Sequence, residues 1–200
     1  MSLVMGMLAS LALVRLGRFR GKMSFAGMIT APLVMPEVIT GLSLLLLFVA
    51  MEKSFGWPGG RGMLTIWIAH VTFSTAFVTV ILSSRLKEID RSLEEAGMDL
   101  GASPLKVFFV ITIPIITPAL LAAWLLAFTL SLDDIVIASF VSGPGSTTLP
   151  MKVFSSVRLG ISPKINALAS IIIALVSLGV LTAGWIVRGW ERKKTMGISQ

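Results

Sequence analysis

The sequence contains no cysteine and only one histidine, His70. Without cysteine there can be no disulfide and no thiolate metal site, and a single histidine leaves no cluster of the usual zinc ligands. We therefore expect no metal site, no cofactor and no catalytic residue. Charged residues are also scarce, at 14% of 200 residues, whereas 55% are hydrophobic and the mean hydropathy is +0.92. This balance excludes a soluble globular domain and predicts a membrane protein.

Four apolar runs are each near the ~20 residues that a helix needs to cross a bilayer core of ~30 Å. They are Gly27–Ala50, Met63–Ser83, Pro118–Val141 and Ile165–Val187. A fifth run, Met1–Val14, is marginal as a span at roughly 14 residues. A signal peptide is the alternative for this run, but no basic segment precedes it and no small-residue cleavage site follows it. The runs predict an all-α membrane protein, a polytopic helical bundle with about five spans in one domain, residues 1–200.

The basic residues predict which loops face the cytoplasm. Segments 15–22, 85–106 and 188–194 each carry four Lys or Arg, and together they hold twelve of the seventeen in the chain. Because cytoplasmic loops are enriched in Lys and Arg, we expect these segments and the C-terminus inside and the N-terminus outside. Topology therefore accounts for the net charge of +7, and we expect no nucleic-acid partner.

A polar, glycine-broken segment at 92–114 separates two of the apolar runs. Ser92–Glu95 fits a capping box, which predicts the start of a short helix, and Gly101 is suited to ending it in a left-handed turn. Ser103, followed by proline, predicts a second helix that continues to Pro114. We expect two short helices joined by a corner. These residues alone leave open whether the segment docks into another protein or is an ordinary interfacial loop.

A sequence motif lies within this segment. Glu95-Ala96-Gly97 is followed after three residues by Gly101, and after nine more by Ile111-Thr112-Ile113-Pro114. The spacing resembles the EAA motif of ABC importer permeases, with Gly97 in place of alanine and Ile113 in place of leucine. Glycine weakens a helix by about 1 kcal/mol relative to alanine but permits closer approach of a partner. The resemblance implies a cytoplasmic coupling segment, 84–117, in which the ATPase-coupling residues are Glu95, Ala96, Gly97, Gly101, Ile111 and Pro114.

The resemblance covers nearly the whole chain. The stretches APLVMPEVITGLSLLLLF and TLSLDDIVIASFVSGPGSTTLPMKVFSSVRLGISPKINALA are similar to the spermidine/putrescine permease subunits of this family. Relative to that family, we expect the chain to begin inside the second of six helices, which accounts for the short first run. The resemblance implies a multi-pass protein of the bacterial inner membrane that transports polyamines, and it leaves open whether putrescine or spermidine is carried.

The sequence lacks a nucleotide-binding motif of its own. The nearest approach to a Walker A motif, GRFRGK at 17–22, has one residue too few between its glycines and is followed by methionine instead of Ser or Thr. We therefore expect a transport subunit, not an enzyme, with ATP hydrolysis in another chain. The family resemblance implies four kinds of partner: a cytoplasmic ATP-binding subunit in two copies, a second related permease subunit, a periplasmic polyamine-binding protein and the lipid bilayer.

Three carboxylates lie in apolar runs, where ionisable side chains are costly and mark pathways, pairs or ligands. Asp133 and Asp134 are adjacent, about 22 Å into their run at ~1.5 Å per residue, and Glu37 lies in an earlier run. A polyamine path needs spaced acceptors with apolar or aromatic walls. Substrate contact by these acids and a structural job, such as capping a broken helix, both remain open. His70 and Trp124 are interpreted as packing residues.

Other functions fit parts of the pattern. A permease for another small cation or a metal complex would share the same features. An ion-coupled secondary transporter also uses intramembrane acids, but it has no need of the coupling segment. An intramembrane aspartyl protease needs two carboxylates opposed across separate helices, whereas Asp133 and Asp134 are contiguous. ATP dependence of uptake would distinguish an ATP-driven permease from an ion-coupled secondary transporter.

Overall fold

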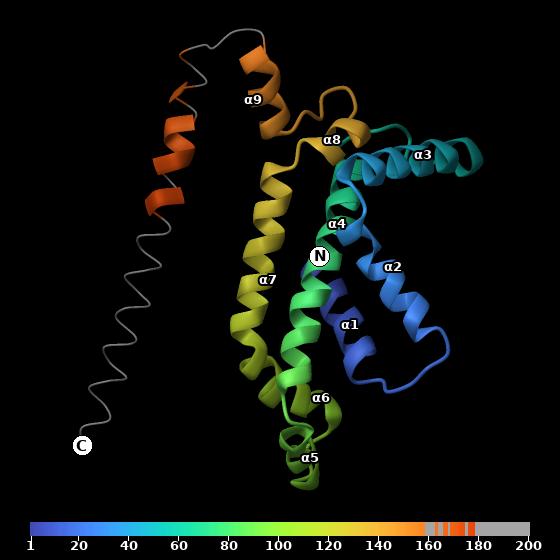
Figure 1. Cartoon of the computed structure of the whole chain (residues 1–200), viewed down its shortest axis with the longest axis vertical. Coiled ribbons are helices and arrows are strands. Elements are labelled where there is room, and N and C mark those ends of the chain that lie inside the picture. Colours follow the sequence, from blue (N-terminus) through green and yellow to red (C-terminus); the bar gives the residue numbers. More distant parts are fainter. Residues whose placement is uncertain (159–162, 164–165, 168, 175, 179–200) are drawn as a thin grey trace. The chain divides into compact units, whose positions relative to one another are not determined.

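A computed structural model of the chain describes residues 1–158, 163, 166–167, 169–174 and 176–178. Every regular element in this part is helical, which confirms the predicted all-α fold class (Figure 1). The chain divides into two compact units, Met1–Met151 and Lys152–Gln200. In the second unit, residues 169–174 and 176–178 are helical. Much of the predicted run Ile165–Val187, and the basic segment 188–194, lie outside the described residues.

The helices follow one another with short connections. They are α1 (Ser2–Val14), α2 (Lys22–Val34), α3 (Glu37–Phe55), α4 (Met63–Glu88), α5 (Arg91–Asp99), α6 (Pro104–Val107), the π-helix η1 (Phe108–Thr112), α7 (Ile113–Asp133), α8 (Val136–Val141) and α9 (Leu149–Arg158). Among the described residues, three helices are long and apolar enough to span a bilayer: α3, α4 and the continuous helix Pro104–Asp133 of 30 residues. As the sequence predicts, α1 is shorter, at 13 residues.

Two predicted spans are wrong as single helices. The run Gly27–Ala50 is divided between α2 and α3, because Met35 and Pro36 adopt extended backbone with ψ of 136° and 137°. A proline disfavours helical backbone at the preceding residue, so the helix ends before it. The run Pro118–Val141 breaks at Asp134, which has ψ of 123°. The helix that contains residues 118–133 is nevertheless long enough to span a bilayer, because it begins at residue 104 instead of 118.

Helix α4 is the central element of the first unit. One side packs with α1 and α7 in a cluster formed by Met7, Val78, Leu82, Leu86, Ile89, Ile116 and Ala123. The other side packs with α3 and α8 in a cluster formed by Phe48, Ile66, Ala69, Phe73, Ile137 and Val141. Apolar residues also occupy exposed positions of α4, among them Leu64, Trp67 and Val80, so the helix has no clear polar face.

Small residues let α1 approach α4 closely. A Cβ added at Gly6 would overlap the Val78 side chain, with 2.8 Å to its Cβ atom. One turn later, Ser10 is fully buried, and its hydroxyl donates to the Met7 carbonyl at 2.8 Å. Glycine and serine four residues apart are typical of packed membrane helices, because small side chains bring the backbones together.

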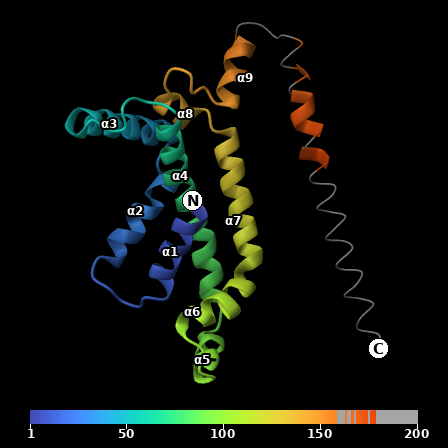
Figure 2. The same ribbon diagram turned by 180° about the vertical axis from the view of Figure 1, so that it is seen from behind.

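The helices place two groups of residues at opposite ends of the first unit. Helices α5 and α6 lie at one end, where α4 finishes and the Pro104–Asp133 helix begins (Figures 1 and 2). Helices α3 and α8 lie at the other end. The predicted coupling residues and the Asp133–Asp134 pair are therefore far apart, and α4 and α7 run between them.

Candidate functional site

Helix α5 opens the segment that carries the sequence motif, and its start differs from the predicted one. Asp90, not Ser92, is the N-cap: its carboxylate accepts from the Ser92 backbone N–H at 3.0 Å. The predicted capping box at Ser92 is wrong, because α4 ends at Glu88 and Asp90 is the first acceptor after the turn. The Ser92 backbone N–H, and then its hydroxyl, stabilise the carboxylate and lower the pKa of Asp90.

The end of α5 confirms the predicted role of Gly101. Gly101 has φ of +84°, its N–H donates to the Met98 carbonyl at 2.8 Å, and the Ala102 N–H donates to the Gly97 carbonyl at 3.2 Å. These two bonds form a Schellman motif, which needs a left-handed residue that glycine supplies without steric cost. The corner between the two helices is therefore defined by backbone hydrogen bonds.

The second helix starts as predicted but does not stop as predicted. Ser103 is its N-cap, accepting from the Lys106 N–H at 3.4 Å, and Pro104 occupies the first turn. The prediction that Pro114 ends this helix is wrong. Immediately before Pro114 the backbone forms a π-helix, in which the Ile113 N–H donates to the Phe108 carbonyl five residues back. The wider turn makes room for the proline ring, so the helix continues into α7.

Glu94 ties the segment, which we call the knuckle (residues 90–112), to the rest of the unit. Its Oε1 accepts from the Arg15 guanidinium at 2.9 Å and from the Thr112 hydroxyl at 3.0 Å. Both side chains of the ion pair are largely shielded, at 17% and 18% exposed. Arg91 adds a bond to the Val14 carbonyl at 3.1 Å. These contacts join α5 to the end of α1 and to η1.

Gly97 is buried inside the knuckle. A Cβ at this position would lie 2.7 Å from Ile111 Cδ1 and 3.2 Å from Val107 Cγ2. The close approach that glycine permits is therefore to this chain's own second helix. Gly97 and Ile111, both motif residues, touch each other and hold the two helices together.

The remaining motif residues are exposed, as are several apolar side chains beside them. Glu95, Ala96, Gly101 and Pro114 are all exposed. Leu100 is 90% exposed and Leu105 is 72% exposed, one on each side of the corner. The motif thus divides into an internal pair that fixes the shape and an exposed set next to an apolar tip.

At the other end of the unit, Asp134 caps a broken helix. Its carboxylate accepts from the backbone N–H groups of Ile137 at 3.1 Å and Ala138 at 2.8 Å, at the start of α8. It also lies 3.0 Å from His70 Nε2. This is the structural job that the sequence left open for the aspartate pair. The neighbouring Asp133, the last residue of α7, is exposed.

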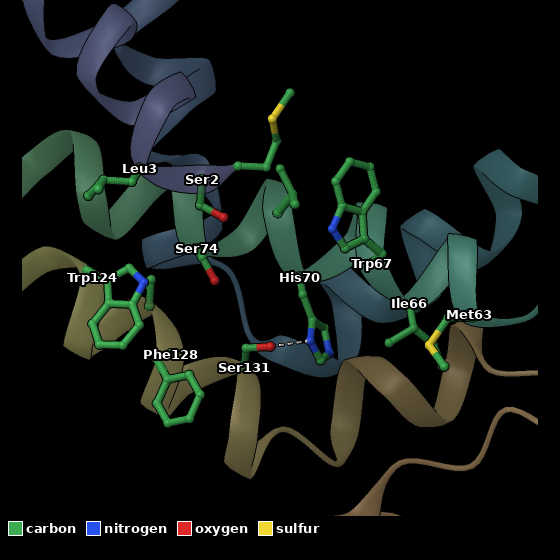
Figure 3. Close-up of a pocket in the computed structure, with 13 residues that line it drawn as sticks. Ser2, Leu3, Met63, Ile66, Trp67, His70, Ser74, Trp124, Phe128 and Ser131 are labelled. Atoms are coloured by element: carbon green, nitrogen blue, oxygen red, sulfur yellow. Dashed lines mark hydrogen bonds between the residues drawn. The ribbon is translucent and has the colours of Figure 1, made fainter.

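His70 connects α4 to both sides of this break. Its Nδ1 lies 2.7 Å from the Ser131 hydroxyl of α7 (Figure 3). The opposite nitrogen, Nε2, faces Asp134. The two ring nitrogens thus contact α7 on one side of the break and Asp134 on the other. His70 has a specific hydrogen-bonding role that the packing interpretation missed, because its partners are more than 60 residues away in sequence.

His70 also lines a pocket of about 360 Å³ between α4 and α7, closed on one side by residues at the start of α1. Figure 3 shows aromatic side chains on both of the main helices. Trp124 and Phe128 stack with ring centroids 5.7 Å apart, and Trp67 is half exposed. The hydroxyls of Ser74 and Ser131 supply polar groups. Aromatic faces with a few acceptors suit a small organic cation.

The predicted acids do not line this pocket directly. Its lining includes neither Asp133 nor Asp134 nor Glu37, although Asp134 reaches it through His70. Glu37 is the exposed first residue of α3, just after the break at Pro36. The sequence therefore identified the acids near the two helix breaks. It did not identify the aromatic side chains that line the pocket, Trp67, Trp124 and Phe128, because their neighbours in sequence are ordinary apolar residues.

Comparisons with known proteins cover nearly the whole chain. A family model described as binding-protein-dependent transport system inner membrane component matches residues 2–195. The chain is 64% identical over 197 residues to the putrescine transport system permease protein PotI of Escherichia coli (strain K12), covering 98% of this chain and 70% of that protein. It is 40% identical over 192 residues to the spermidine/putrescine transport system permease protein PotC of the same strain, covering 96% and 70%.

Proposed function

Because the chain belongs to the family of binding-protein-dependent transport system inner membrane components, we propose that it is the permease subunit of an ATP-driven polyamine importer. The identity of 64% to a putrescine permease carries this proposal. Identity to a spermidine/putrescine permease is lower, at 40%, which favours putrescine as the substrate. The protein itself hydrolyses no ATP and converts the closure of partner subunits into alternating access.

The knuckle is the part that docks on the ATPase subunit. It has a fixed shape, because Asp90 caps its first helix, the Schellman corner joins the helices and Glu94 ties it to α1. Its tip exposes Leu100 and Leu105, whose burial in a groove would be favourable by about 25 cal/mol per Å² of apolar surface. Glu95, Ala96 and Gly101 accompany this tip and are proposed to contact the ATPase.

The pocket beside His70 forms part of the substrate path. Putrescine is an apolar chain with an ammonium group at each end, and aromatic faces attract ammonium groups within about 6 Å. Asp134 is committed to the start of α8 and to His70. Asp133 and Glu37, which are exposed, are the acids proposed to meet the substrate. A second, related permease subunit completes the path around these residues.

The same proposal sets location and partners. The protein lies in the bacterial inner membrane, with the knuckle, the basic segment 15–22 and the C-terminus on the cytoplasmic side. Two copies of an ATP-binding subunit dock from that side. A periplasmic polyamine-binding protein delivers substrate on the opposite side, near the helix breaks.

Transport by the reconstituted complex tests the function. Labelled putrescine and spermidine are offered, with the binding protein, to vesicles that contain both permease subunits and the ATPase. We expect uptake that requires ATP, is unaffected by a protonophore and is faster for putrescine. Uptake driven by an ion gradient without ATP would support a secondary transporter instead. Uptake of neither amine, with the complex intact, would point to another small cation.

A further inference from the structure

A basic pocket lies between the loop after α1, the start of α2 and the end of α4. Its volume is about 780 Å³, and Arg18, Lys22 and Lys87 line it. Among the described residues that line it, none is acidic. Three cations around one cavity without an acid repel one another, so the cavity favours an anion.

A buried hydroxyl in the same pocket lacks a partner. Ser83 lines the cavity and is only 9% exposed, and its Oγ makes no hydrogen bond within the described part of the chain. A buried polar group without a partner loses its hydrogen bonds to water and gains none in return, so such groups are normally satisfied. A rotation of the Ser83 side chain toward the cavity would let this hydroxyl donate to an anionic oxygen there.

The start of α2 adds further donors. Its N-cap, Gly21, has φ of +86°, and no side chain in the described residues caps this helix. Its first-turn residues Met23 and Ser24 line the pocket. The N–H groups of a first helical turn have no partner inside the helix and carry partial positive charge, which suits phosphate oxygens.

The rest of the lining is apolar. Leu13 of α1 and Phe19 of the loop line the cavity together with Met23, whose side chain is 91% exposed. A free inorganic anion gains nothing from these groups, whereas a phospholipid would lay the start of its acyl chains on them. Under the proposed topology, the pocket also lies where the cytoplasmic headgroups are.

We propose that this pocket binds the phosphodiester headgroup of an anionic phospholipid. Arg18, Lys22 and Lys87 neutralise the phosphate, and the Ser83 hydroxyl donates to one of its oxygens. Lys22 keeps donors free, because only one of its three is used by the Gly17 carbonyl, at 2.8 Å. The placement of the pocket at the headgroups rests on the proposed function, but its anion chemistry does not.

Direct lipid binding to the purified complex tests the proposal. Native mass spectrometry follows titrations with phosphatidylglycerol and with phosphatidylcholine of the same acyl chains, and inorganic phosphate is added as a competitor. Each cation near a membrane surface contributes about fivefold to anionic lipid binding, so Arg18→Gln with Lys87→Gln should weaken phosphatidylglycerol binding roughly 25-fold. Lys53→Gln with Lys152→Gln removes the same charge from residues outside the pocket and should leave binding unchanged.

Ser83→Ala provides an arm that changes no charge. It should weaken phosphatidylglycerol binding about fivefold, the value of one hydrogen bond, and it decides the matter if the double variant fails to assemble. Equal binding of the two lipids, equal loss in the control pair or wild-type binding by Ser83→Ala would each overturn the proposal. Displacement of lipid by an equal concentration of phosphate would assign the pocket to a free anion. None of these readouts depends on polyamine uptake, so the two proposals can fail separately.

Discussion

Replacing Gly101 with alanine should weaken docking of the ATPase subunit through the backbone alone. Gly101 has φ of +84°, and a Cβ there would meet no atom within 4 Å, so the added methyl group creates no clash. Left-handed backbone costs an L-residue about 1–2 kcal/mol. If the free knuckle relaxes to avoid this strain, the docked shape becomes less stable than the relaxed shape by about the same 1–2 kcal/mol. The affinity for the ATPase subunit then falls about 5- to 30-fold.

The assay is the affinity of the purified ATPase subunit for the permease pair in nanodiscs, with ATP-dependent putrescine uptake recorded beside it. Gly56→Ala is the matched control, because Gly56 also ends a helix, at φ of +67°, and has no neighbour within 4 Å of an added Cβ. Gly101→Asn should recover much of the affinity, since asparagine tolerates left-handed backbone. If Gly101→Ala lowers affinity no more than Gly56→Ala does, the shape of the corner is irrelevant to docking and the reasoning fails.

Three further predictions concern the acids. Glu94→Gln should lower the free energy of unfolding by about 2 kcal/mol in denaturant titrations, whereas Glu88→Gln, which breaks a more exposed ion pair, should cost less than about 0.5 kcal/mol; equal losses would refute a tie through Glu94. Asp134→Ala should cost about 1–2 kcal/mol through the lost cap, while Asp133→Asn should keep stability and lower putrescine uptake; the reverse pattern would contradict the assignment. Because the pKa of Asp90 is lowered in the folded protein, the stabilisation by its N-cap is fully present above pH 3.8 and is lost as the pH falls through the lower folded pKa. An NMR titration of its carboxyl group with a midpoint at or above pH 3.8 would contradict this.

The corner of the knuckle could be predicted from sequence because its signals are local. Gly101 and Ser103 form hydrogen bonds with backbone groups only three residues away, so both partners of each bond lie in the same short stretch of sequence. The start of α5 was predicted two residues late, because Asp90 and Ser92 are both acceptable caps and only the path of the chain after α4 selects between them. Pro114 was misread because a π-helical turn has no sequence signature of its own.

The break at Asp134 and the pocket beside it could be predicted only in part. An intramembrane acid pair signals a costly feature, yet the sequence cannot distinguish a helix cap from a substrate ligand, since both use the same carboxylate. In the structure, Asp134 caps the start of α8 and lies beside His70. Trp67 and Trp124 line the same pocket only because α4 packs against α7. Such contacts between distant segments are not encoded in local periodicity.

The unbroken helix from Pro104 to Asp133 has a mechanical consequence. Its 30 residues give a rod of about 45 Å, with the knuckle at one end and Ser131 beside the pocket near the other. A tilt of about 10° around the knuckle would displace Ser131 by roughly 7 Å, which exceeds the reach of its hydrogen bond to His70. If the proposed ATPase subunit rotates the knuckle, this rod would act as a lever that turns a small rotation into the separation of the Ser131 and His70 side chains.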